Sequence, residues 1–171
     1  YYYELIDGKI YVTYEPDLSE DWTEKWILFK MGHYSREHPE IINYVTDKAR
    51  VFVPGRTRIT VPEPDLAAYH DFPTHLPIRQ LNWQDVSPLL VGEIMSAGDP
   101  YKDLVRNVEL YLRVPSIKEY WLFDTREDAD HPSMRVYRRH GKSWRIIDLS
   151  YGEIYTTKLL PGFKLIIDPR T

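Results

Sequence analysis

Two acidic residues of this sequence occupy positions that are unusual for a carboxylate. Asp65 follows Pro64 where an apolar segment begins, and Glu93 lies inside the apolar run Leu90–Met95. Burial of a carboxylate is costly, so proteins usually retain one in such a place only where it is paired or coordinates a metal ion. Two such groups on neighbouring strands could hold Mg²⁺, which prefers one or two carboxylates, a carbonyl oxygen and several waters, and which suits phosphate substrates.

A simpler interpretation of the two acids stays open. An aspartate after a proline is common in turns, and a single glutamate in a strand can lie at a sheet edge or pair with Arg56, Arg58 or Lys102. On spacing alone this interpretation is favoured, because a pattern of only two acids is short and weak.

The composition limits the kind of protein that this chain can be. Its 171 residues, 43% of them hydrophobic and 28% charged, fit a single folded domain over residues 1–171 and exclude a disordered tail. The absence of cysteine excludes a disulfide framework, a thiol nucleophile and a cysteine-bearing zinc site, and it suits a reducing compartment. No apolar run approaches the roughly 20 residues of a membrane span, so we expect a soluble, cytoplasmic protein.

The formal net charge of -4 argues against a protein that holds nucleic acid by bulk positive charge. It does not exclude a local site, because an enzyme that binds a divalent cation carries clustered carboxylates whose charge the cation partly offsets. An acidic chain is therefore compatible with an enzyme that acts on phosphate groups.

The elements that precede the two acids follow from the hydrophobic pattern. Apolar runs on both sides of Asp7-Gly8 predict a β-hairpin, since this dipeptide favours a tight turn. Capping and acidic residues from Ser19 onward predict the start of a helix that ends near His38-Pro39. The residues whose spacing predicts one apolar stripe on this helix are Trp22, Trp26, Ile27, Phe29 and Met31.

The rest of the chain predicts strands and one further helix. The proline-rich residues 70–88 indicate a long loop, and Asp99-Pro100 can begin a helix that Pro115 ends. We expect strands over residues 49–53, 58–69, 89–95, 118–124, 134–138, 144–149 and 163–167. This order of elements predicts a mixed α/β domain.

Five segments of the sequence occur together in one known family. They are residues 3–8, Pro64-Asp65-Leu66, Glu93-Ile94-Met95-Ser96, the helical segment 103–111 and residues 119–124. In this order, with comparable spacing and over nearly the whole chain, they resemble the Uma-type restriction endonucleases, a bacterial family of the PD-(D/E)XK nuclease superfamily. No single motif is decisive, but five in order argue against a chance match.

The resemblance implies a restriction-endonuclease-like fold, in which helices flank a central mixed β-sheet. It puts Asp65 and Glu93 at the positions of the two metal-binding acids of the superfamily, and it makes the backbone carbonyl of Ile94 the third ligand. The implied metal is Mg²⁺, with Mn²⁺ as a substitute. Glu4 matches an early glutamate of the family and is expected near the metal or its water shell, or else on the solvent face of the hairpin.

The chain departs from the family pattern at both places where a lysine is expected. The superfamily lysine normally lies two residues beyond the second acid, where this chain has Met95. Uma-type sequences commonly carry the lysine instead on the following helix, where this chain has Asn107. A cation near the scissile phosphate must therefore come from elsewhere. Lys102 is the first candidate and Arg106 the second, although each can also be a solvated helix residue.

Basic residues also gather in a predicted hairpin near the C-terminus. Arg138, Arg139 and Lys142 alternate there with aromatic residues and, with Arg106, could bind the phosphate backbone of a nucleic acid. A solvated strand face explains them equally well. DNA is the expected partner, and a homodimer is expected because two symmetric sites can cut two strands.

Three hypotheses about function follow. The first is a metal-dependent nuclease that hydrolyses phosphodiester bonds, with Asp65, Glu93, Lys102 and Glu4 as catalytic residues. The second is a weakened or inactive module of the same fold that binds nucleic acid or a protein, since neither lysine position holds a lysine. The third is a glycosidase that uses two opposed carboxylates. Acids that meet in one pocket with a cation reaching toward them would favour the first hypothesis over the second.

Overall fold

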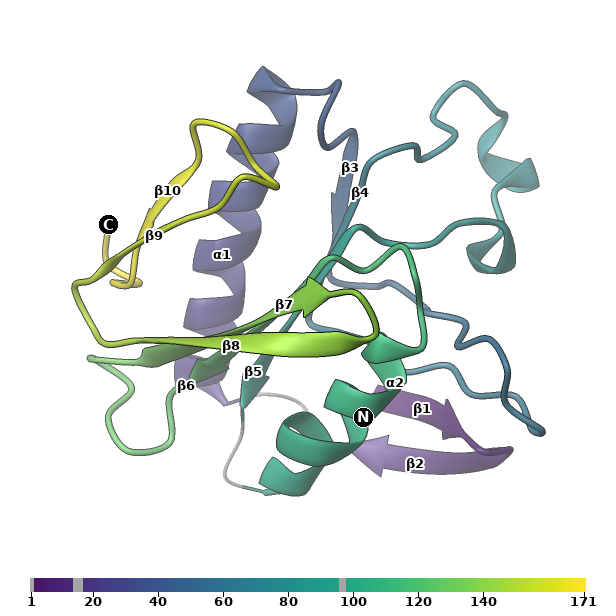
Figure 1. The fold of residues 1–171 in the computed structure, drawn as a ribbon, viewed down its shortest axis with the longest axis horizontal. Coiled ribbons are helices and arrows are strands. Elements are labelled where there is room, and N and C mark those ends of the chain that lie inside the picture. The colour runs from purple at the N-terminus through teal and green to yellow at the C-terminus, as the bar shows by residue number, and fades with distance from the viewer. Residues whose placement is uncertain (1, 14–16, 96–97) are drawn as a thin grey trace.

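The structure, a computed structural model that describes residues 2–13, 17–95 and 98–171, is built around a six-stranded mixed β-sheet (Figure 1). The spatial order of its strands is β3-β4-β5-β6-β7-β8. The strands are β3 (Tyr44–Thr46), β4 (Leu66–Tyr69), β5 (Leu90–Met95), β6 (Glu119–Asp124), β7 (Ser133–His140) and β8 (Ser143–Leu149). Within this sheet β5 and β6 pair in parallel and the other neighbours pair antiparallel.

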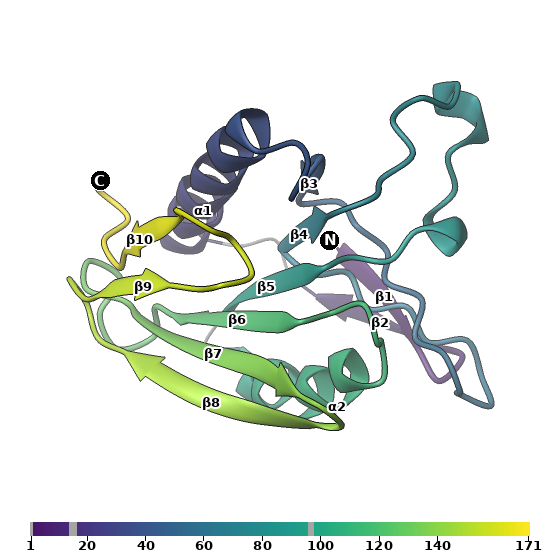
Figure 2. The same ribbon diagram turned by 45° about the horizontal axis from the view of Figure 1, so that its top comes forward.

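Helix α1 (Leu18–Glu37) covers one face of this sheet, as Figure 2 shows. Asp17 caps its N-terminus in a reciprocal capping box with Glu20, and the helix ends at the predicted place, with His38 as the C-cap before Pro39. The residues that α1 buries in the core beneath it are Trp26, Ile27, Met31 and Tyr34. Neither α1 nor any other helix in the described ranges is long and apolar enough to cross a membrane.

A shorter helical region covers the opposite face of the sheet. It begins near Pro100, continues through the π-helical segment η3 (Lys102–Arg106) and ends as α2 (Asn107–Leu112), close to the predicted helix. The apolar residues of this second core include Val91, Leu110, Tyr111, Tyr120 and Leu122. The sheet therefore separates two cores, and the strand faces that carry Glu93 and Met95 point toward α2.

The N-terminal hairpin lies beside α2 at the edge of the molecule (Figures 1 and 2). It pairs β1 (Tyr2–Ile6) with β2 (Lys9–Thr13), and its turn at Asp7-Gly8 has φ angles of 50° and 73°, as the sequence predicts. A β-bridge between Leu5 and Val61 attaches the hairpin to the segment that leads into β4.

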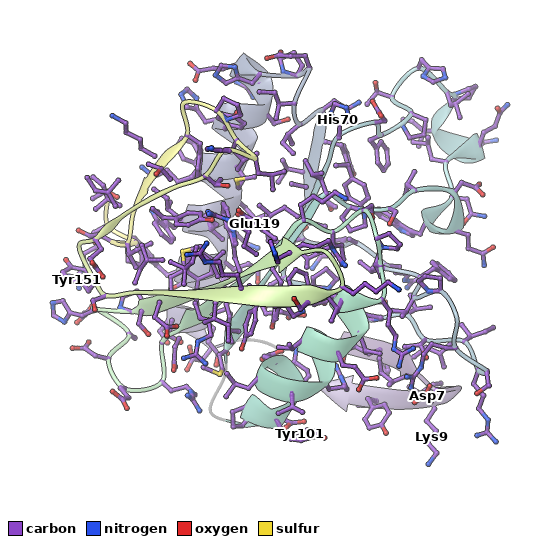
Figure 3. All side chains as sticks on the ribbon, in the orientation of Figure 1. Asp7, Lys9, His70, Tyr101, Glu119 and Tyr151 are labelled. Carbon is purple, nitrogen blue, oxygen red and sulfur yellow. The ribbon has the colours of Figure 1, made fainter. Side chains whose placement is uncertain are left out.

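The C-terminal hairpin, β9 (Ile154–Thr156) with β10 (Lys164–Ile166), packs on the sheet face that α1 covers. Glu119 of β6 joins it to the sheet from the interior of the molecule (Figure 3). The side chains that donate hydrogen bonds to its carboxylate, all within 2.9 Å, are Trp121, Arg138, Tyr155 and Thr157. Because this buried charge is fully paired, we assign it a structural role.

Residues 70–88, the predicted long loop, project from the sheet between β4 and β5 (Figure 2). The loop contains only two short 3₁₀ turns, η1 (Ile78–Gln80) and η2 (Trp83–Asp85). Ring contacts of Tyr69, Phe72 and Trp83 hold its base against the sheet.

Two of the strand predictions are wrong in detail. Residues 49–53 and 58–65 form no regular strand, although the backbone N–H of Val51 donates to the carbonyl of Pro62 at 3.0 Å. Prolines in this region lack the N–H that a continuous ladder requires, so the pairing stays local. The strands β3 and β9 were not predicted, because three residues carry too little of a period-two pattern.

The predicted stripe of α1 is also corrected by the structure. Trp26, Ile27 and Met31 are buried as expected, but Trp22 and Phe29 are 60% and 74% exposed. Their spacing puts them on the side of the helix away from the sheet, which the local apolar run at residues 26–29 concealed.

Candidate active site

Asp65 and Glu93 lie side by side on adjacent strands. Asp65 immediately precedes β4, and the antiparallel register that pairs Leu66 with Gly92 puts it next to Glu93. The backbone N–H of Ile94 donates to Asp65 Oδ2 at 2.7 Å, which fixes the Asp65 side chain against β5. Burial and the neighbouring charge of Glu93 raise the pKa of Asp65 well above its usual value.

Glu93 is fully buried, and α2 supplies its hydrogen-bond donors. Its Oε1 atom accepts hydrogen bonds from Asn107 Nδ2 at 2.9 Å and from Tyr111 Oη at 2.7 Å. Burial raises the pKa of Glu93, while the charge of Lys102 opposes this shift. The two donors orient the carboxylate and leave Oε2 facing the start of the helix.

Lys102 reaches this second oxygen from the π-helical segment. Its Nζ lies 3.4 Å from Glu93 Oε2 and 3.3 Å from Asp103 Oδ1. Burial lowers the pKa of Lys102, but the surrounding carboxylates of Glu93, Asp103 and Asp65 outweigh this effect and raise it well above the usual value. The ammonium group is therefore held in its charged form.

The π-helical geometry explains how Lys102 and Asn107 meet at one carboxylate. The N–H of Asn107 donates to the carbonyl of Lys102, five residues earlier, and such wider turns often occur at functional sites. Asp103, Asn107 and Tyr111 follow one another at four-residue spacing on the face that points to Glu93. This spacing was visible in the sequence, but it did not reveal that Asn107 and Tyr111 both bind Glu93.

Glu4 belongs to the same cluster, but it contacts Arg106 rather than either of the two central acids. Its Oε2 accepts a hydrogen bond from Arg106 Nη2 at 2.5 Å, and its Oε1 accepts one from the backbone N–H of Glu63 at 3.4 Å. Arg106 also donates to Asn107 Oδ1 at 3.1 Å and lies over the Tyr11 ring. The N-terminal hairpin is thus tied to the helix that carries Lys102.

The cluster carries more negative than positive charge. Its acids are Asp65, Glu93, Asp103 and Glu4, and its cations are Lys102 and Arg106, which leaves two uncompensated charges when all are ionised. This imbalance, with burial as the largest cause, raises the pKa of Asp103 to about 8. A divalent cation would supply the missing positive charge, so the residues present fit Mg²⁺.

The donor set that could hold a metal is small. No group of three or more His, Asp or Glu side chains within the described residues is arranged as a metal site. Mg²⁺ does not need one, because it usually keeps several waters and takes one or two carboxylates with a carbonyl oxygen. Asp65, Glu93 and the carbonyl of Ile94 match that requirement. Asp65 Oδ1 accepts no hydrogen bond from the part of the chain that the structure describes, and so stays free for a ligand.

A pocket of about 380 Å³ lies at the C-terminal ends of β5 and β6, and its lining contains neither Asp65, Glu93 nor Lys102. Met95 of β5 and Leu104 of η3 line its inner wall. Its polar wall consists of the ion pairs Asp124–Arg126 and Arg135–Asp148.

The basic residues of the β7–β8 hairpin lie apart from the acids, and Arg138 and Arg139 have internal partners. Arg138 pairs with Glu119 on the α1 side of the sheet. Arg139 donates to the carbonyls of Leu112 and Val114 beyond the end of α2 and lies over the Trp144 ring. Lys142 is exposed beside the turn. A role of these three residues in binding nucleic acid stays a prediction.

The fold places this site in a known class. A mixed sheet flanked by helices, with two acids at the adjoining ends of β4 and β5, is a restriction-endonuclease-like fold. The crystal structure of a putative nuclease belonging to DUF820 from Anabaena variabilis superposes with a TM-score of 0.69 at 15% sequence identity, covering 96% of this chain and 87% of that one. The chain belongs to the Uma2 family, described as "Putative restriction endonuclease", whose model matches residues 1–168. No curated protein matches the chain. The implied fold and family are both confirmed.

Proposed function

We propose that this protein is a metal-dependent nuclease that hydrolyses phosphodiester bonds of DNA. The observation that carries the proposal is the convergence of Asp65 and Glu93 at one buried point, with the ammonium group of Lys102 3.4 Å from Glu93. Membership of a restriction endonuclease family supports a nucleic acid as the substrate.

The carboxylates of Asp65 and Glu93, with the backbone carbonyl of Ile94, would hold Mg²⁺ or Mn²⁺. When bound, such an ion lowers the pKa of a coordinated water and stabilises negative charge on phosphate oxygens. Neither function requires a further protein ligand.

The side chains around these acids have separate tasks. Tyr111 and Asn107 donate to Glu93 Oε1 and hold the carboxylate in one orientation. Lys102 keeps its positive charge and can donate to a nonbridging phosphate oxygen from the position where it now contacts Glu93. Arg106 and Glu4 position this helix against the N-terminal hairpin and so act through Lys102 and Asn107.

A nuclease assay with purified protein tests the proposal. We expect cleavage of DNA with Mg²⁺ or Mn²⁺, no cleavage with EDTA, and loss of cleavage in Asp65→Asn and Glu93→Gln. Asp71→Asn, which neutralises an exposed carboxylate beside His70 on the 70–88 loop, is the matched control and should retain full activity. Full activity of either of the first two variants would show that the site lies elsewhere.

A second candidate is a module that binds nucleic acid without cleaving it. Met95 and Asn107 at the two expected lysine positions are the observation that favours it. DNA binding by the wild-type chain, without cleavage under any divalent metal, would establish this candidate and exclude the nuclease.

A further inference from the structure

The outer face of α1 carries three large apolar side chains in one line. Leu18, Trp22 and Phe29 are 81%, 60% and 74% exposed, and they are spaced by one and then about two turns. They lie opposite the residues that α1 buries against the sheet. Several large apolar side chains exposed on one side of a helix are a candidate site of association.

This surface extends onto the neighbouring hairpin and is held in place. Trp22 Nε1 donates to the carbonyl of Pro169 at 3.0 Å, which fixes the indole ring although most of it is exposed. The hairpin β9–β10 lies next to α1 (Figure 2), and its cross-strand pair Ile154 and Ile166 is 59% and 42% exposed. A fixed, exposed tryptophan is the kind of residue that contributes most to binding energy at protein interfaces.

Gly32 leaves the outer face of α1 without a side chain at one position. A Cβ atom added at Gly32 would meet no atom within 4 Å, so the space above this residue is open. Gly32 lies close to the line of Trp22 and Phe29, near the other end of the helix. A large side chain from another molecule could fill this space.

We propose that a second copy of this chain packs antiparallel on the outer face of α1, about a two-fold axis near residue 27. In this arrangement each position i faces position 54 - i of the other copy. Trp22 then covers Gly32 of the partner subunit, and the alkyl stem of Lys25, whose ammonium pairs with Glu24 at 2.9 Å, lies over Phe29 of the partner subunit. A large residue covers a glycine and an alkyl stem covers an aromatic ring, twice in one symmetric interface.

The charges of the helix favour the same arrangement. Its first half carries Glu20, Asp21 and Glu24 with one cation, Lys25, and its second half carries Lys30 and Arg36 with one acid, Glu37. Antiparallel packing brings the acidic half of one helix opposite the basic half of the other, with Asp21 at the level of His33 of the partner subunit, whereas parallel packing would bring halves of like charge together. This face lies on the other side of the sheet from Glu93, so the inference does not depend on the proposed chemistry.

Light scattering and sedimentation of the full chain at micromolar concentration test the interface. We expect a dimer whose dissociation constant increases at least tenfold in Trp22→Glu, in Phe29→Glu and in Gly32→Leu. Ile78→Glu changes an apolar residue that is 85% exposed on the 70–88 loop and should leave the dimer unchanged. A wild-type chain that is monomeric overturns the proposal, even if it binds another protein. A dimer that all three variants leave intact overturns it as well.

Cross-linking gives a second measurement that does not rely on weakening the interface. Because the chain has no cysteine, single cysteines report unambiguously on proximity. A mixture of the variants Asp21→Cys and His33→Cys should form mixed disulfide dimers faster than either variant alone. Preferential linkage of Asp21→Cys to itself would indicate parallel packing and contradict the proposal.

Discussion

Lys102 supplies the positive charge of the candidate site although it does not stand at either expected lysine position. Asn107 stands at one of those positions and donates hydrogen bonds through a neutral amide. The π-helical segment brings Lys102 to the same carboxylate from one turn earlier. Two residues therefore share the tasks at this carboxylate: Asn107 donates a neutral hydrogen bond, and Lys102 supplies a positive charge.

If Lys102 stabilises charge on the phosphate, its removal should slow cleavage. We expect Lys102→Met to lower kcat by about 10²–10³-fold, which is typical for loss of one positioned donor, and to leave a measurable rate. Asp65→Asn should be more damaging, because it removes a metal ligand. Lys164→Met, a change on the exposed face of β10, serves as the control, and equal rates in the two lysine variants would refute the role of Lys102.

Asp103 couples folding stability to pH in the metal-free protein. Its pKa in the folded state is about 8, compared with an ordinary value of 3.8. Between pH 3.8 and pH 8 the folded state therefore holds a proton that the unfolded state has lost. The associated stability is fully present below pH 4 and is lost as the pH rises toward 8. Urea unfolding in EDTA should show this decline, and Asp103→Asn should make it shallower. Parallel curves for the two proteins would argue against it.

At the level of elements, the packing of β4 on β5 sets the relative position of the two acids. Gly92 precedes Glu93, and a Cβ atom there would lie 3.2 Å from Leu66 Cδ2 and 3.3 Å from Leu66 Cβ. Leu66 in turn follows Asp65. The absence of a side chain at position 92 thus allows the close approach that aligns both acids.

Gly92→Ala should therefore disturb the site through Leu66, although it changes none of the site's charged or hydrogen-bonding side chains. We expect a loss of about 1–3 kcal/mol in the free energy of unfolding, as for other overpacked cores, and a rate that is lower by on the order of tenfold. Leu66→Val in the same chain should recover part of both losses, because it removes a methylene from the crowded position. Chemical denaturation measures the stability and the nuclease assay measures the rate. If neither quantity changes in the single variant or in the double variant, the packing of Gly92 on Leu66 does not set the position of the acids.

For the molecule as a whole, the sheet assigns different tasks to its two faces. The α2 face holds the acids and Lys102, while the α1 face holds the hairpin joined by Glu119 and the proposed interface. The excess negative charge on the α2 face destabilises the metal-free fold, which is a common cost of a functional site.

Metal binding should therefore stabilise the whole fold. At a Mg²⁺ concentration about 100-fold above its dissociation constant we expect a gain of about 2.7 kcal/mol, or roughly 5–10 °C in Tm for a domain of this size. Asp65→Asn and Glu93→Gln should melt at a higher temperature than the wild type in EDTA and gain little from Mg²⁺. An equal Mg²⁺-dependent increase in these variants would mean that the ion binds elsewhere.

Whether the sequence predicts a structural feature depends on how far apart in the chain the interacting residues lie. The Asp7-Gly8 turn, the end of α1 at His38 and the buried strand around Glu93 were predictable, because each depends on neighbours within a few residues. The outward position of Trp22 and Phe29 was not, because the helix is apolar on more than one side and only its packing on the sheet selects the buried side.

The same distinction applies to the charged residues. Local pattern and family resemblance are sufficient to select Asp65 and Glu93 and to indicate that a lysine is missing from its usual places. Which cation replaces it, and which arginines are occupied by internal partners, follows from contacts between residues far apart in the chain, such as Arg106 with Glu4 and Arg138 with Glu119. Folding brings these groups within hydrogen-bonding distance, and no short-range periodicity records that proximity.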